Sequence, residues 1–154
     1  MKPRETVNLY RLLSITSIIL VTFGVTALMC LGNHFYLDEW LCLFFLDLIF
    51  VCIYLFELEY ERRSGKLSNN TKSNFIRLAC IYTLCAALTY GASYLPEFCK
   101  PVILIPILMC AVSNSTMAIV VGIFFDILLS ISAGGYSYAL IALCLLTLLG
   151  GVLA

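Results

Sequence analysis

The 154-residue chain is 62% hydrophobic and only 12% charged, and its mean hydropathy is +1.04. Soluble domains contain about 45–50% apolar and about 25% charged residues, so this composition excludes a water-soluble globular protein. The formal net charge is zero, and neither basic cluster interleaves aromatic residues as a nucleic-acid surface does, so no nucleic-acid partner is expected. We predict an all-α fold, a polytopic integral membrane helix bundle.

Apolar segments follow one another along the chain. A helix needs about 20 residues to cross the hydrocarbon core of a bilayer. Most of the segments approach this length, but 102–112 is shorter, and it is either a short span or one arm of a re-entrant hairpin. We predict about six transmembrane segments, at 12–31, 40–56, 78–94, 102–112, 117–133 and 136–154.

A hydrophilic loop divides the chain into two membrane parts. We predict a two-helix part at 1–57, a basic loop at 58–74 and a four-segment part at 75–154. Ser, Asn and Gly in the loop are typical of a flexible connection. The apolar run that ends at Ala154 has no polar tail, whereas most polytopic proteins end in a solvated segment. A truncated chain is therefore one interpretation that stays open.

The positions of the basic residues predict the orientation. Three of the nine precede the first segment, and five lie between the second and the third. By the positive-inside rule, the N-terminus and the loop are cytoplasmic. We expect the loop cations to contact anionic lipid headgroups or a cytoplasmic partner. These cations are Arg62, Arg63, Lys66, Lys72 and Arg77.

The fifth segment contains an acid, Asp126, in the middle of an apolar run. A mid-membrane Asp costs about 2.5–3.5 kcal/mol on insertion scales, and the surrounding aliphatic and Phe residues offset this with about 3–6 kcal/mol. Small or polar residues recur at four-residue spacing and so share one helix face. This pattern predicts a helix–helix seam. Its members are Ala118, Gly122, Asp126 and Ser130.

Three roles for Asp126 stay open: an interhelical hydrogen bond that fixes packing, the docking of a partner protein, and coupling to an ion or substrate. No catalytic set accompanies it, since the only histidine stands alone and no zinc-protease, P-loop or nucleophile-elbow motif is present. The eight cysteines include no C-x-x-C pair. We expect no enzyme activity, no cofactor and no metal.

The third segment repeats the four-residue spacing of small residues. Small side chains let helix backbones approach closely, which favours packing in lipid. We therefore predict direct contact between the third and fifth helices. The alternative is that Ala and Gly are merely common in membrane helices. The residues are Ala79, Thr83, Ala87 and Gly91.

A second intramembrane acid, Asp47, lies in the second segment. Its helical neighbours, such as Leu43, Phe44 and Phe50, are bulky, so no stripe of small residues surrounds it. We predict a lesser role for Asp47 and a position toward the outer face of the membrane.

Several short motifs follow one another from Phe75 onward: F-I-R-L-A-C-I-Y, then C-K-P-V-I-L-I-P, then G-I-F-F-D with Gly122 and Asp126, then S-A-G-G-Y-S-Y-A-L. Their order resembles the MreD family of rod-shape-determining membrane proteins over about half of the chain. The two helices before residue 57 and the absence of further helices after Ala154 depart from the family's pattern.

This resemblance implies a noncatalytic scaffold component of the bacterial cell-shape and peptidoglycan elongation machinery, in the cytoplasmic (inner) membrane. Its expected partners are membrane lipids, MreC-like proteins and cell-wall synthases, and Gly122 and Asp126 would organise the bundle. The chain is also similar at this level to the S components of vitamin or small-solute transporters. In that alternative, Asp126, Tyr136 and Tyr138 would line a ligand pocket.

Overall fold

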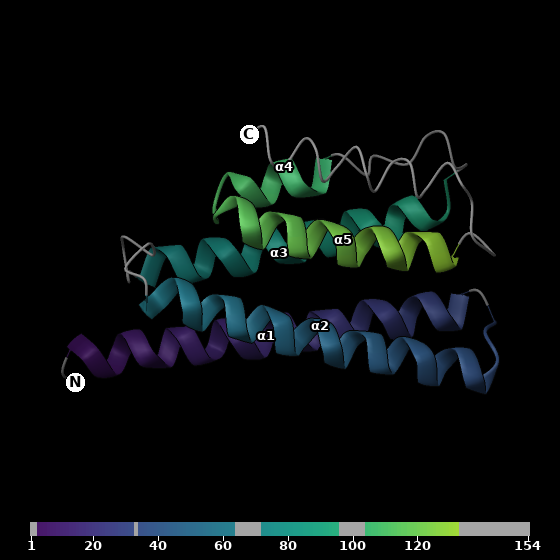
Figure 1. Ribbon diagram of the computed structural model, residues 1–154, viewed down its shortest axis with the longest axis horizontal. Helices are drawn as coiled ribbons and strands as arrows, with labels where there is room; N and C mark the ends of the chain where they lie inside the picture. Colours follow the sequence, from purple (N-terminus) through teal and green to yellow (C-terminus); the bar gives the residue numbers. More distant parts are fainter. Residues whose placement is uncertain (1–2, 33, 64–71, 96–103, 133–154) are drawn as a thin grey trace.

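The structure, a computed structural model, describes residues 3–32, 34–63, 72–95 and 104–132. Within these ranges the chain is all-helical, as predicted, with five helices and no strand (Figure 1). The helices are α1 (Pro3–Gly32), α2 (Leu37–Arg63), α3 (Lys72–Ser93), α4 (Leu104–Cys110) and α5 (Ser115–Ser132).

Three helices are long and apolar enough to cross a membrane, over Leu9–Gly32, Leu37–Tyr60 and Ser73–Ser93. They confirm that the chain has the character of a helical membrane protein. The apolar part of α5, Ser115–Ile131, is shorter. Helix α4 has only seven residues, about 10 Å of a hydrocarbon core that is about 30 Å thick. The last predicted segment, 136–154, lies outside the described residues.

Helices α1 and α2 form an antiparallel hairpin, shown in purple and blue in Figure 1. The rings of Phe23 and Phe44 lie 5.3 Å apart between their centroids. Nearer the other end of the hairpin, Arg11 Nη2 lies 2.9 Å from Glu59 Oε2. The contact partners run in opposite directions along the two helices, which is the arrangement expected for neighbours joined by a short turn.

The start of α2 follows from local sequence. The backbone N–H of Tyr36, just before the helix, donates to Glu39 Oε2 at 2.8 Å. A Glu in the first turn that bonds back to the capping N–H is half of a capping box. Asp38 and Glu39 also place negative charge at the positive end of the helix dipole. The turn is closed by His34, whose φ is 54°.

Helices α1 and α3 lie parallel. Ser14 Oγ donates to the carbonyl oxygen of Phe75 at 3.1 Å, and further along both helices Thr22 Oγ1 lies 2.7 Å from the hydroxyl of Tyr82. The second contact therefore lies eight residues after the first on α1 and seven residues after it on α3, so the two helices run in the same direction. Two parallel helices, with an antiparallel helix between them in the chain, are what an up-down-up path through a membrane produces.

Aromatic rings join α5 to both α2 and α3. Phe50 of α2 stacks on Phe124 of α5, with centroids 3.9 Å apart and an interplanar angle of 16°. Tyr82 of α3 packs against Phe125 with centroids 5.5 Å apart. Tyr54 lies beside Phe50 and Tyr82 in the same buried cluster. Because these rings come from three helices, they hold the centre of the bundle together.

Candidate functional site

Asp126 is fully enclosed by protein, with 0% of its surface exposed. Gly122 and Ala118, one and two turns earlier on the same face, are also buried, and Ser130 is half-buried. The stripe predicted on the fifth segment therefore faces the interior of the bundle. The acid is not on a lipid-exposed surface of α5, where it would be most costly.

The helix that packs on this stripe is α4. A Cβ added to Gly122 would lie 3.4 Å from the Cβ of Pro106, at the edge of ordinary van der Waals contact. The absence of a side chain at Gly122 thus lets the Pro106 ring approach the backbone of α5. The sequence pattern found this seam but paired it with the third segment, and the structure pairs it with the fourth.

The small-residue stripe on α3 does not make the contact between α3 and α5. Thr83, Ala87 and Gly91 are exposed, and a Cβ on Gly91 would meet no atom within 4 Å. Ala79 is half-buried. The predicted contact between the two helices exists, but large rings make it, since Tyr82 faces inward against α5. The prediction of this stripe as the seam with α5 is therefore wrong.

Asp47 is also 0% exposed, and it has a defined partner: Thr26 Oγ1 donates to Asp47 Oδ1 at 2.9 Å. The helix around it is longer than the predicted segment 40–56. Asp47 lies about 15 Å along α2 from Leu37, near the middle of the span Leu37–Tyr60. Its distance from the outer face of the membrane stays a prediction.

The threonines of α1 connect three helices. Thr22 Oγ1 donates to the carbonyl of Ile18 at 2.8 Å, so its single proton is used and the Tyr82 hydroxyl must be the donor in the 2.7 Å bond between them. One turn further, Thr26 holds Asp47. Thr22, Thr26 and Cys30 recur at four-residue spacing on a buried face. This polar stripe on the first segment, which we did not single out from the sequence, was the pattern that could have identified Asp47.

The two buried acids do not form a pair. Phe124 faces α2 through its stacking on Phe50, and Asp126, two residues later, projects about 200° around α5 from Phe124. Gly122 shares that face and packs on Pro106. Asp47 therefore lies on the α1–α2 side of the bundle, whereas Asp126 lies on the α4 side.

Part of the basic cluster lies at the end of the bundle where the chain begins. Glu59 accepts from Arg11 at 2.9 Å and from Arg63 Nε at 3.1 Å, one turn away on α2. Arg77 is exposed on α3. Lys66 lies outside the described residues, and so do the side chains of Arg62 and Lys72. The geometry of the proposed headgroup contacts stays a prediction.

Within the described ranges, no group of three or more His, Cys, Asp or Glu side chains gathers in a way that could hold a metal ion. Comparison with protein families, with curated proteins and with solved structures gives no match to this chain. Fold and site together define a protein with the character of a helical membrane protein and two acids, Asp47 and Asp126, that are fully buried in it.

Replacing Asp126 distinguishes a packing role from a charge-dependent role. Asp126→Asn is expected to keep near wild-type stability, because an amide retains a carbonyl acceptor. Asp126→Leu is expected to lose more than the roughly 0.6 kcal/mol average of an interhelical hydrogen bond in a membrane. Thermal unfolding in detergent measures both. The exposed Asp38, replaced in the same two ways, is the control, and equal loss in both Asp126 variants would show that a charge is required.

Proposed function

We propose that this protein is a noncatalytic membrane scaffold, part of the cell-shape and peptidoglycan elongation machinery of the bacterial cytoplasmic membrane. The proposal includes about six spans, a cytoplasmic N-terminus, and other membrane proteins as partners. Its sequence support is the order of motifs from Phe75 onward, which resembles the MreD family. Its structural support is the enclosure of Asp126.

The observation that supports this role best is that Asp126 is fully buried on the same helix face as the close contact between Gly122 and Pro106. An acid that couples to a solute needs a cavity through which the solute reaches it. Pro106 covers the face of α5 at Gly122, one turn before Asp126, and the acid itself is fully covered. We therefore expect this buried acid to fix how the helices pack.

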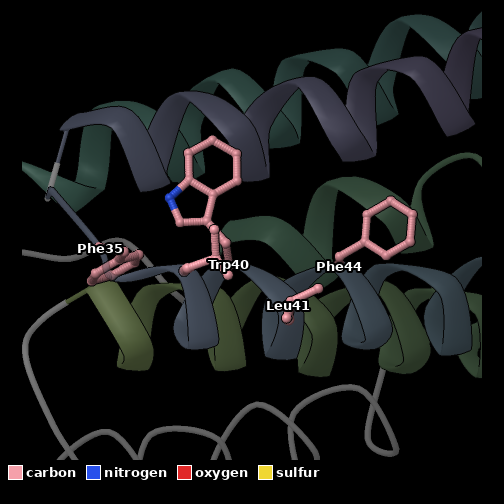
Figure 2. Close-up of a pocket in the computed structure, with 5 residues that line it drawn as sticks. Phe35, Trp40, Leu41 and Phe44 are labelled. Atoms are coloured by element: carbon pink, nitrogen blue, oxygen red, sulfur yellow. The ribbon is translucent and has the colours of Figure 1, made fainter.

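Two surface cavities lie away from the acids. One, with a volume of about 460 Å³, is at the start of α2, and Figure 2 shows the side chains around it. A second, of about 280 Å³, lies along α3. Both linings are apolar, as expected of surfaces that face lipid or another helix. The first cavity is lined by Phe35, Leu37, Trp40, Leu41 and Phe44.

The exposed stripe of α3 is the proposed contact for a partner helix. Thr83, Ala87 and Gly91 are exposed in this chain, and the second cavity runs past Ala87 and Gly91. In lipid, where apolar burial does not favour one apolar neighbour over another, small residues give helices close van der Waals contact. A partner helix would therefore pack more closely here than on the bulky outer face of α2.

A cross-linking pull-down tests this function. The protein is purified in mild detergent from bacterial cells after membrane cross-linking, and co-purified proteins and small molecules are identified by mass spectrometry. We expect cell-wall membrane proteins in the wild-type sample and their loss with Ala87→Trp. Ile53→Trp, on the exposed face of α2, is the matched control. A retained small molecule without a protein partner would instead favour the transporter alternative and contradict the scaffold.

A further inference from the structure

Asp47 is a buried acid to which the proposed scaffold function assigns no role. Its side chain is fully covered, and Thr26 donates one hydrogen bond to Oδ1. The other oxygen, Oδ2, has no hydrogen-bond partner among the residues that the structure describes. A carboxyl group near the middle of a membrane span, with half of its hydrogen-bonding capacity unused, needs a physical explanation.

No Lys or Arg side chain that the structure describes is close enough to neutralise a negative charge at Asp47. Arg11 precedes Thr26, the partner of Asp47, by about 22 Å along α1. Arg63 follows Asp47 by about 24 Å along α2. Arg77 lies on α3 about 13 Å short of the level of Asp47.

The titratable groups that face Asp47 are acids or neutral. From α1, the Cys30 thiol lies within electrostatic range of its carboxyl, and from α3 the Tyr82 hydroxyl does. Ionising either would add negative charge. Helix α5 presents Phe124 to α2, and its own acid, Asp126, projects from another face. Among the residues that the structure describes, only the hydroxyl of Thr26 would stabilise a carboxylate here.

The free-energy costs of the ionised and the protonated carboxyl indicate which of the two forms is present. An ionised carboxylate without a counter-ion, in a region of low dielectric constant, loses much more solvation free energy than one hydroxyl can replace. A protonated carboxyl leaves a single neutral O–H unsatisfied, which is a far smaller cost. The neutral acid also keeps Oδ1 as the acceptor for Thr26.

We propose that Asp47 is a proton-binding site inside the α1–α2–α3 interface, which holds its proton at neutral pH and so makes the stability of the bundle dependent on pH. In a chain unfolded by denaturant, with its helices withdrawn from lipid, the same carboxyl meets water and is ionised at neutral pH. The folded state then binds one more proton than the unfolded state, so stability falls as pH rises. The site depends only on α1, α2 and α3 and stands whether or not the scaffold function is right.

Infrared spectroscopy of the protein in lipid vesicles tests the protonation state directly, because the C=O stretch of a protonated carboxyl is resolved from the amide bands. At neutral pH we expect this band in the wild type and its loss in Asp47→Asn. Thr26→Val should shift the band, because Oδ1 loses its hydrogen-bond donor. This second variant keeps the test decisive if Asp47→Asn does not fold. A wild-type spectrum without such a band, or one that neither variant changes, would overturn the proposal.

The pH dependence of unfolding is the second readout. Between the pH at which the unfolded carboxyl ionises and the higher pH at which the folded one does, the unfolding equilibrium constant of the wild type should rise by up to about tenfold per pH unit from this one proton. Asp47→Asn cannot bind the proton and should lack that contribution. An identical slope in both proteins would contradict a proton site at Asp47.

Discussion

Phe50→Ala is expected to destabilise the bundle by about 3 kcal/mol, near the low end of the range for Phe→Ala in soluble cores. Phe50 is 4% exposed, stacks on Phe124 and lies near Tyr54 and Tyr82. Removing its ring leaves a cavity between helices α2, α3 and α5, and the ring atoms around that cavity lose their dispersion contacts. The loss stays at the low end because a separated helix in a bilayer still keeps its Phe in an apolar environment.

Phe45→Ala is the matched control, because Phe45 belongs to the same helix and is 62% exposed. Its ring contacts lipid before and after the helices separate, so its removal should change stability little. Thermal unfolding in detergent measures both variants through the buried thiols of Cys30 and Cys85, which react with a maleimide dye on unfolding once accessible cysteines have been blocked. Equal losses for Phe50 and Phe45 would show that the aromatic cluster does not hold the helices together.

Gly122→Leu is expected to separate α4 from α5. A single added Cβ already reaches 3.4 Å from Pro106, so the remaining atoms of Leu would overlap the proline ring unless α4 moved. Overpacking a close contact typically costs about 1–3 kcal/mol, and the effect here should reach the upper part of that range because Pro106 is rigid and buried. Gly122→Ala should be nearly neutral, since its contact stays at the edge of the ordinary range.

Gly91→Leu tests the specificity of that effect. Gly91 is exposed on α3 with no atom within 4 Å of an added Cβ, so Leu should fit and stability should stay near that of the wild type. Stability is measured as for Phe50, and a cysteine pair introduced at Pro106 and Gly122 reports their proximity by disulfide formation. If Gly91→Leu unfolds the protein as strongly as Gly122→Leu, close α4 packing is not the reason for glycine at position 122.

The membrane helices were the most predictable part of the fold, because hydrophobic length is a one-dimensional property. The first two predicted segments fall within apolar helices of the structure, and the third, 78–94, does so except for its last residue; each helix begins before its predicted limit. Those limits were short because charged residues such as Glu57, Glu59 and Arg77 lower the local hydropathy without ending the helix. Helix ends are set by capping and packing, which hydropathy does not measure.

Which helices contact each other, and through which faces, was less predictable. Both stripes of small residues are present on helix surfaces, yet the stripe with Gly122 is buried against Pro106 and the stripe with Ala87 is exposed. Spacing identifies the residues that share a face, but every face of a membrane helix is apolar, so hydrophobicity does not reveal which face turns inward. Helix α3 contacts α5 through the large rings of Tyr82 and Phe125 instead of through its small residues.

The sequence by itself determined that this is a membrane protein, where its first three helices run, and that an acid at position 126 needs an enclosed site. The tertiary structure decided that α4 covers the Gly122 face and that Asp47 lies at mid-span beside Thr26. The physical reason is that transfer into lipid depends on each segment alone, whereas a buried polar group is stabilised by a partner from another helix. That partner is known only when the helices are placed side by side.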